Sequence, residues 1–352
     1  MVDSPAVGWL LRWRTSNTMT TVHFAINGLG RVGRALLRLT RDRPELRLVA
    51  LNDQADPGAL ARLVAHDSLH GRFPGTVAAS AEGLVVDGRT IPLFREADPA
   101  RIPWPTTRAT VVVEATGQFR TRALAAAHLG GSVRRVVVSA TAEGADATFC
   151  FGVNHESFDP DRHHVVSNAS CTTNCLAPVL LVLEREFGIE QALIDTVHCY
   201  TNSQRLMDMA HVDPRRARAA ALNIIPTTSD AVGALPLVLP ALAGKLAGLA
   251  FRVPVPNGSL VDVTATLSRP TTADELRHAF RAAAHGPLGR ILAVTEEELV
   301  SVDFIGDPHS ATVDLPLLEV VGGRLARVVA WYDNEWGYAN RLADLLLHLG
   351  TS

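Results

Sequence analysis

Short apolar runs alternate with amphipathic stretches in the first half of the chain. An apolar run at residues 22–26 leads through glycines into an amphipathic stretch at residues 31–40, and a second apolar run follows at residues 46–51. Two further apolar runs, each followed by turn residues, lie at residues 111–115 and 135–139. Strand, helix and strand at this spacing predict a parallel sheet covered by helices.

The pattern changes in the second half of the chain. Residues 171–187 predict one long helix, and residues 202–218 form a polar, arginine-rich stretch. The remaining elements are three β-branched runs and a closing amphipathic helix, at residues 249–255, 259–267, 327–332 and 337–349. These runs predict a second domain built on a larger, mostly antiparallel sheet, so we expect an α/β protein of two domains.

The overall charge argues against some classes of partner. The formal net charge of the 352 residues is −3, which gives no electrostatic reason to expect nucleic acid or an anionic membrane as the main partner. Lys245 is the only lysine, and because the arginines are spread along the whole chain we predict no basic patch. No apolar run reaches the roughly 18 residues that a membrane span needs. Four cysteines in a chain without a secretory signal predict free thiols and a cytoplasmic protein.

The first 18 residues stand apart from this pattern. They show no clear period, and a second methionine, Met19, comes immediately before the first strand. We expect residues 1–18 to be a disordered extension or a misplaced start, with a targeting role as the alternative.

A glycine motif follows the first strand and opens the first helix. Gly28, Gly30 and Gly33 are spaced as G-x-G-x-x-G, which permits a tight turn and brings backbone N–H groups close to a pyrophosphate. Asp53 ends the next strand, where its carboxylate can bind both hydroxyls of an adenosine ribose and repel a 2′-phosphate. The motif predicts a Rossmann domain that binds NAD, with weaker use of NADP, and a purely structural glycine turn is the alternative.

A cysteine and a histidine form the candidate catalytic pair. Cys171 lies at the predicted start of a helix, where the positive end of the helix dipole stabilises a thiolate, and nearby N–H groups could hold an oxyanion. His198 follows after one helix and a returning strand, so the two side chains can meet as an activated nucleophile and its base. The alternatives are a small buried cysteine, as we expect for Cys150 and Cys199, and a structural histidine.

Five segments resemble the phosphorylating glyceraldehyde-3-phosphate dehydrogenase family. They occur in the family's order and spacing over nearly the whole chain, and they are residues 27–34 (NGLGRVGR), 167–175 (SNASCTTNC), 215–221 (RRARAAA), 252–257 (RVPVPN) and 331–338 (WYDNEWGY). The resemblance implies a Rossmann NAD-binding domain at residues 19–170, an α+β catalytic domain with a mostly antiparallel sheet at residues 171–333, and a C-terminal helix at residues 334–352 that returns to the first domain.

The family also implies a role for each matching residue. Cys171 is expected to be the nucleophile and His198 the base in the oxidation of glyceraldehyde 3-phosphate to 1,3-bisphosphoglycerate, through a thiohemiacetal and a thioester. Thr201 and Arg252 are expected to bind the substrate's phosphate, and Ser170, Thr172 and Arg216 the attacking inorganic phosphate. The expected cofactor contacts are Asn27, Gly28, Gly30, Arg31, Val32, Gly33, Asp53, Thr116, Gly117, Ser139 and Asn334. A homotetramer is expected, in which residues 202–218 reach a neighbour's cofactor, and no metal.

Several positions depart from the family pattern near the phosphate sites. Ser203 stands where many members have aspartate, and Ser229 and Asp230 where the family often has threonine and glycine. Two further departures are Gly233 in place of a lysine and Met209-Ala210 in place of the Leu-Pro that helps exclude NADP. These differences bear on fine specificity and not on the type of reaction, and the alternatives within it are an erythrose-4-phosphate dehydrogenase and an inhibitor-tolerant or arsenate-linked paralogue. A binding or regulatory protein that has lost catalysis is the alternative from another class, and the intact Cys171 and His198 count against it.

Overall fold

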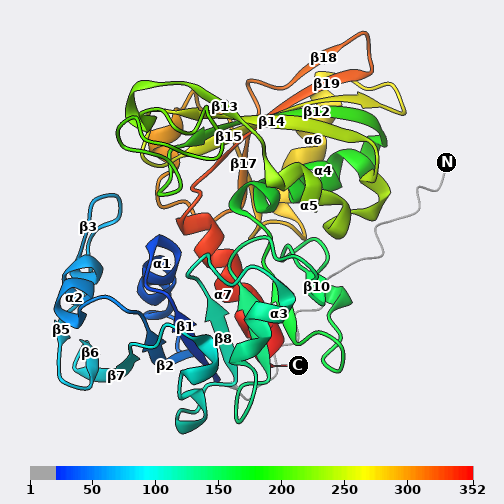
Figure 1. Ribbon diagram of the computed structural model, residues 1–352. Coiled ribbons are helices and arrows are strands. Elements are labelled where there is room, and N and C mark those ends of the chain that lie inside the picture. The colour runs from blue at the N-terminus through cyan, green and yellow to red at the C-terminus, as the bar shows by residue number, and fades with distance from the viewer. Residues whose placement is uncertain (1–20, 352) are drawn as a thin grey trace.

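The computed structural model describes residues 21–351, which form two sheets with their covering helices (Figure 1). The expected extension at residues 1–18 lies outside the described residues. No helix in the described part of the chain is long and apolar enough to cross a membrane.

The first sheet carries the Rossmann topology. Its strand order is β10-β11-β9-β8-β1-β2-β7-β6-β5, and the strands from β10 to β7 pair in parallel. The parallel strands are β1 (Val22–Asn27), β2 (Leu46–Asn52), β7 (Arg89–Phe94), β8 (Val111–Glu114), β9 (Arg135–Val138), β10 (Ala147–Thr148) and β11 (Val165–Ser167). The antiparallel strands β5 (Val77–Ala79) and β6 (Gly83–Val86) extend one edge beyond the region that the apolar pattern predicts.

Three helices accompany this sheet. They are α1 (Arg31–Thr40), α2 (Pro57–Ala65) and α3 (Arg122–Ala125). The helix α1 follows the glycine turn directly and buries Leu36 and Leu37 with the residues of β1 and β2, because these apolar positions fall on one side of the helix.

The second sheet contains the longest strands, and they pair in both parallel and antiparallel directions. Its order is β13-β14-β12-β15-β19-β17-β16, in which only β12/β14 and β16/β17 pair in parallel, while β18 pairs antiparallel with β19. The strands are β12 (Ile189–Cys199), β13 (Ile225–Thr227), β14 (Leu246–Val253), β15 (Ser259–Leu267), β16 (Leu292–Thr295), β17 (Ala311–Asp314), β18 (Glu319–Val321) and β19 (Leu325–Tyr332). A mostly parallel sheet of Rossmann topology and a mostly antiparallel second sheet confirm the fold expected from the sequence.

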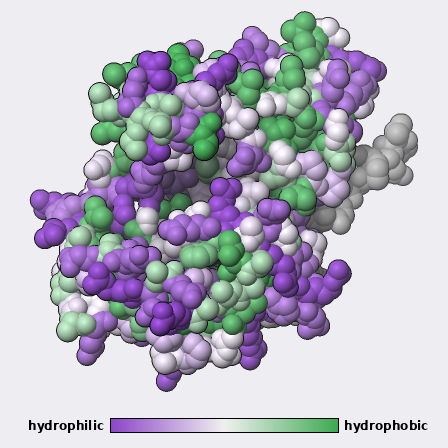
Figure 2. Space-filling model, in the orientation of Figure 1, coloured by the Kyte–Doolittle hydropathy of each residue, from purple (hydrophilic) through white to green (hydrophobic). Residues whose placement is uncertain are grey.

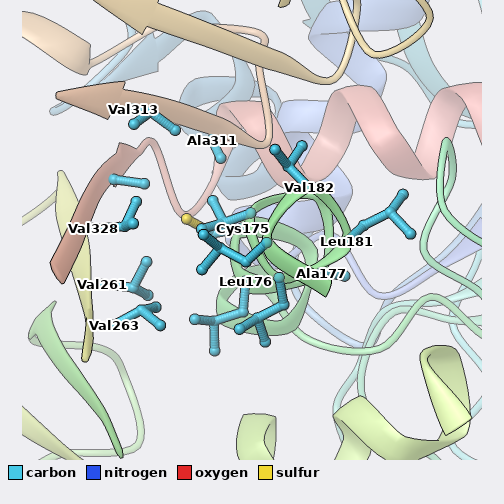
Figure 3. Packing of buried hydrophobic residues seen from close by; sticks show 14 of the residues in the cluster. Cys175, Leu176, Ala177, Leu181, Val182, Val261, Val263, Ala311, Val313 and Val328 are labelled. Atoms are coloured by element: carbon cyan, nitrogen blue, oxygen red, sulfur yellow. The ribbon is translucent and has the colours of Figure 1, made fainter. Parts of the chain in front are cut away.

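The helix α4 (Cys171–Phe187) forms the centre of the second core. It packs beside α5 (Asp230–Val238) and α6 (Ala273–His285) on one face of the sheet, where Cys175 and Leu176 meet residues of the strands such as Val261 (Figure 3). Because α4 is almost wholly buried, its first residue is held in place by the whole domain.

The last helix, α7 (Trp336–Gly350), crosses back to the first domain (Figure 1). Its leucines, including Leu342 and Leu346, join the same core cluster as Leu36 of α1. We propose domain boundaries near residues 170 and 334, which this change of packing partners supports.

Candidate active site

The glycine turn between β1 and α1 is shaped for close backbone approach. Gly28 has a φ of +97°, and a Cβ there would lie 2.8 Å from the backbone nitrogen of Thr116. A Cβ on Gly33 would lie 2.1 Å from the carbonyl oxygen of Gly28, so neither position accepts a side chain. A Cβ on Gly30, in contrast, would meet nothing within 4 Å. Space at the second glycine, in front of the first turn of α1, is what a bound pyrophosphate requires.

Asp53 lies at the edge of the same cleft. Its two carboxylate oxygens accept hydrogen bonds from the backbone N–H groups of Leu29 at 2.7 Å and Ala55 at 2.9 Å. These bonds fix the carboxylate beside the glycine turn and leave lone pairs for a ligand's hydroxyls, because each ionised oxygen can accept more than one hydrogen bond.

The cleft itself has a volume of about 380 Å³. It lies outside the carboxyl ends of β1, β2 and β8, the usual place for a ligand on a parallel sheet. Its lining includes Asn27, Gly28, Gly30, Asp53 and Thr116 from the expected cofactor contacts. The lining residues that the sequence analysis missed are Asn52, Gln54, Glu96, Ala97, Ala115, Gln118 and Phe119.

A buried carboxylate, Glu114, holds two residues of the cleft lining in place. It accepts hydrogen bonds from Asn27 Nδ2 at 2.6 Å and from both the N–H and the hydroxyl of Thr116. Trp104 Nε1 donates to His128 Nδ1 at 3.0 Å, so His128 carries its proton on Nε2 and donates it to Glu114 Oε2 at 3.0 Å. Glu114 was not singled out in the sequence, although a single acid at the end of an all-valine strand is a signal for such a network.

The other expected cofactor residues have partners of their own. The Arg31 guanidinium is held between the carboxylates of Asp67 and Glu335, so it links α1 to the start of α7 instead of facing outward alone. Val32 lies in the first turn of α1, Gly117 in the turn after β8, and Ser139 directly after β9. Asn334 Oδ1 accepts hydrogen bonds from Cys199 Sγ at 3.1 Å and Ser259 Oγ at 3.2 Å, which fixes the orientation of its amide.

A tight turn delivers Cys171 to the start of α4. Ala169 adopts a left-handed φ of +54°, which is rare for a residue with a side chain and is typical of functional sites. Ser170 caps the helix by accepting a hydrogen bond from the Thr173 N–H at 3.0 Å. Cys171 is therefore the first helical residue, as its sequence position predicts, with free N–H groups of the first turn beside it.

The Cys171 thiol lies close to the His198 ring within the second domain. Sγ lies 3.5 Å from Nε2 of His198, which comes from β12. On the neighbouring parallel strand β14, Arg252 stands beside His198 in the ladder, and its Nη1 lies 2.6 Å from Nδ1 of the imidazole. The structure thus brings together a thiol, an imidazole and a guanidinium.

The two neighbours of His198 Nδ1 make opposite demands on it. The carbonyl oxygen of Cys199, 2.8 Å away, can only accept a proton, whereas Arg252 can only donate one. When Nδ1 donates to the carbonyl oxygen, Nε2 is free to accept the proton of Cys171. When Nδ1 accepts from Arg252, Nε2 carries the proton itself.

Burial decides the resting charge of this pair. Burial raises the pKa of the Cys171 thiol, while Arg252, the Thr172 hydroxyl and backbone N–H groups oppose the rise. Burial, followed by the charge of Arg252, lowers the pKa of His198 to about 3. The expected stabilisation of the thiolate is therefore present but smaller than the cost of burial, so the resting pair is a thiol and a neutral imidazole.

The expected phosphate ligands make contacts of their own. Thr172 Oγ1 lies 2.8 Å from the buried Tyr332 hydroxyl, and Thr201 Oγ1 lies 2.9 Å from the hydroxyl of Ser203. Arg216 Nε donates to Thr227 Oγ1 at 2.8 Å. The structure gives none of Thr201, Arg216 and Asp230 a direct contact with Cys171.

The two departures at the start of α5 have separate tasks. Ser229 caps the helix, with its hydroxyl 3.4 Å from the Ala231 N–H. Asp230 is the first helical residue, and its side chain is 72% exposed and lies 3.6 Å from Arg120 of the first domain. The Asp230 carboxylate therefore faces outward and not toward the expected phosphate site. The helix cap is supplied by Ser229 and not by Asp230.

Figure 2 shows that the surface is hollowed between the two domains, with hydrophilic residues around the hollow. The cofactor cleft lies at the carboxyl edge of the first sheet. In the sequence, Cys171 at the start of α4 follows soon after β11, a strand of that sheet. The arrangement can hold a dinucleotide beside an activatable thiol.

Comparison with known proteins gives the same picture from the whole sequence. The model of the glyceraldehyde 3-phosphate dehydrogenase NAD-binding domain matches residues 22–122, and that of the C-terminal domain matches residues 170–334. The chain is 51% identical to the glyceraldehyde-3-phosphate dehydrogenase of Kitasatospora aureofaciens, covering 92% of this chain and 97% of that protein. The corresponding enzymes of Geobacillus stearothermophilus and Streptomyces coelicolor are each 47% identical over 94% of this chain, covering 98% and 99% of those proteins.

These matches confirm the resemblance seen in the five sequence segments, and NAD as the cofactor. The chain belongs to the glyceraldehyde-3-phosphate dehydrogenase family of NAD-dependent oxidoreductases that act on an aldehyde.

Proposed function

We propose that the chain oxidises glyceraldehyde 3-phosphate and joins inorganic phosphate to the product, giving 1,3-bisphosphoglycerate. The observation that carries the proposal is the 3.5 Å contact between Cys171 Sγ and His198 Nε2 at the start of a buried helix. The names and near-complete coverage of the relatives support the same substrate.

The first steps belong to Cys171 and His198. The sulfur attacks the aldehyde carbon while His198 Nε2 takes the thiol proton and returns it to the aldehyde oxygen, which leaves a thiohemiacetal on Cys171. The N–H groups at the start of α4 stabilise the oxygen as it gains charge. NAD, when bound in the glycine cleft, supplies the acceptor for the hydride. Loss of that hydride, with the hydroxyl proton passing to His198, converts the thiohemiacetal to a thioester.

Inorganic phosphate then releases the product. A phosphate oxygen attacks the thioester carbon, the bond from carbon to sulfur breaks, and the acyl phosphate leaves while Cys171 regains a proton. We place the attacking phosphate near Ser170, Thr172 and Arg216, and their positions around the start of α4 and beside the Thr227 hydroxyl support this. Ser229 and Asp230 border the same region in our proposal.

Arg252 and Thr201 are the proposed ligands of the substrate's own phosphate. Arg252 is only partly exposed, and within residues 21–351 no carboxylate forms an ion pair with it. A partly buried guanidinium without a counter-ion is a strong anion site, because desolvation strengthens its interaction with a bound phosphate.

The proposed cofactor contacts are the glycine turn and the residues around it. They are Asn27, Gly28, Gly30, Arg31, Val32, Gly33, Asp53, Thr116, Gly117, Ser139 and Asn334. The open space at Gly30 and the fixed carboxylate of Asp53 support this assignment. For Arg31 and Asn27 the backbone is the contacting part in our proposal, because both side chains are engaged within the protein.

The assembled protein is proposed to be a cytoplasmic homotetramer. The segment at residues 202–218 exposes several large apolar side chains, which a monomer in water would rarely leave uncovered. They are Leu206, Met207, Met209 and Val212, exposed by 79%, 69%, 60% and 100%. The four cysteines are all free, which supports a reducing compartment.

The test is NADH formation from glyceraldehyde 3-phosphate, measured with and without inorganic phosphate. Turnover that depends on phosphate is the expected result. Rapid turnover of erythrose 4-phosphate without phosphate would favour the alternative in which water releases the thioester. Absence of NADH from either aldehyde, with NAD still bound, would favour a binding or regulatory protein.

A further inference from the structure

A second cleft lies on the first domain, apart from the proposed cofactor cleft. Its lining runs from the amino ends of β1 and β2, at Thr21, His23 and Arg47, to Phe94, the last residue of β7. Its volume of about 720 Å³ is within the range of small-molecule sites. The cleft shares no lining residue with the cofactor cleft.

Three cationic or titratable side chains line this cleft. His23 and Arg47 are partners in the ladder between β1 and β2, and Arg108 comes from the loop before β8. Both arginines are exposed, and in the described part of the chain neither takes part in an ion pair with a carboxylate. The sequence predicts no basic patch because the arginines are far apart along the chain, but the parallel sheet brings these two together.

The surrounding charges leave this positive field uncompensated. No acidic residue lines the cleft. Burial, then Arg108 and then Arg47, lower the pKa of His23, so the cations act on one another without a balancing carboxylate. Burial and Arg47 also lower the pKa of Arg89, which donates to the Leu48 carbonyl oxygen on the adjoining strand.

The rest of the lining is apolar and includes an aromatic ring. Val49, Pro44, Pro92 and Phe94 line the cleft, and Phe94 packs edge-on against Trp104 with ring centroids 5.9 Å apart. This contact holds the ring of Phe94 in one orientation. A fixed aromatic ring in one cleft with two guanidinium groups suits a ligand that has a flat ring system and a phosphate, because arginine binds phosphate in a bidentate manner and aromatic faces stack on bases.

We propose that this cleft binds a nucleoside phosphate, with the phosphates between Arg47 and Arg108 and the base against the apolar wall formed by Val49 and Phe94. The site is separate from the NAD cleft and does not depend on the proposed reaction.

Calorimetry on the full chain tests the proposal, with guanosine 5′-diphosphate as the probe and one equivalent of NAD per chain to fill the cofactor cleft. We expect saturable binding of the nucleotide, and at least about tenfold weaker binding of inorganic phosphate and of guanosine, since each offers only half of the contacts. The double variant Arg47→Ala/Arg108→Ala should lose at least about tenfold in affinity.

A matched variant controls for net charge. Arg62 and Arg162 are exposed arginines outside the cleft, so Arg62→Ala/Arg162→Ala removes the same charge and should change the affinity by less than about twofold. Unchanged thermal unfolding of both double variants shows that the fold persists. Three results would overturn the proposal: no saturable binding of the nucleotide, equal weakening in both double variants, or inorganic phosphate that binds as tightly as the nucleotide.

Discussion

The cofactor cleft and the proposed catalytic pair differ in how completely their polar groups are hydrogen-bonded. Beneath the cleft, Glu114 is satisfied by Asn27, His128 and Thr116, and at its edge both oxygens of Asp53 have backbone donors. At the catalytic pair, His198 Nδ1 faces both an acceptor and a second donor, Arg252, which forms no ion pair within residues 21–351.

The difference follows from what each region has to do. A satisfied network is rigid and offers a finished surface to the cofactor. An unsatisfied group changes its proton or its partner when a ligand arrives, which is what a site for covalent chemistry requires. Variants can therefore distinguish the two regions, since defects at the pair should affect turnover and defects at the cleft should affect cofactor binding.

Replacing the proposed nucleophile should give the largest effect. Cys171→Ser is expected to abolish turnover and to leave NAD affinity nearly unchanged, because a hydroxyl is far less acidic and cannot form the thioester. Steady-state NADH formation measures turnover, and NAD titration measures the affinity for NAD. Cys175→Ala, one helical turn further along α4, is the control and should retain activity. Substantial turnover by Cys171→Ser would show that catalysis is not covalent at this residue.

Replacing the proposed base should have the next largest effect. His198→Asn is expected to slow turnover by about 10²–10⁴-fold, the usual share of a general base. NAD affinity should again be unchanged. His285→Asn removes an exposed histidine and serves as the control. If the two variants had equal kcat values, His198 would have no part in proton transfer.

The cofactor cleft should respond to one added methyl group. Gly30→Ala fills space that is open in the structure, so the protein should fold normally while NAD affinity falls by about 10–100-fold, equivalent to about 1–3 kcal/mol of overpacking. Gly33→Ala is the contrast, because its Cβ would lie 2.1 Å from the Gly28 carbonyl oxygen and should lower the unfolding temperature. Unaltered NAD binding by Gly30→Ala would mean that no ligand approaches this glycine.

Asp53 should set the choice between NAD and NADP. Repulsion of a 2′-phosphate at ~4 Å and an effective dielectric of ~20 is on the order of 4 kcal/mol, reduced further by solvent. We therefore expect a higher kcat/KM with NAD, and Asp53→Ser should narrow the ratio by about tenfold. A natural preference for NADP would show that the carboxylate does not face the ribose.

The smallest effect is expected at Asp230. Because its carboxylate is 72% exposed and turns toward Arg120, Asp230→Gly should change the KM for phosphate by less than about twofold. Arg120→Ala removes the partner and should behave in the same way. A several-fold drop in KM for Asp230→Gly would show that the carboxylate turns into the phosphate site and repels its ligand.

The sequence predicts individual helices, strands and turns better than it predicts which of them lie side by side. The glycine turn and the helix at Cys171–Phe187 are visible because their signals are local, namely turn residues, a cap and an apolar period. The antiparallel strands β5 and β6 and the cluster of Arg47 with Arg108 depend on which strands pair, and short apolar runs do not specify that choice. The burial that raises the pKa of the Cys171 thiol is also absent from these local signals, since burial is a property of the packed domain.

The parallel register of β12 and β14 makes anion binding and proton uptake reciprocal events. An anion bound to Arg252 offsets the charge that, after burial, lowers the pKa of His198, and a protonated imidazole in turn strengthens the hold on the anion by the same factor. An aldehyde without a phosphate leaves that charge in place and so meets a weaker base. Arg252 as the proposed phosphate ligand therefore predicts discrimination between aldehydes in the rate of the chemical step as well as in affinity, from two residues that are paired in the ladder between neighbouring strands.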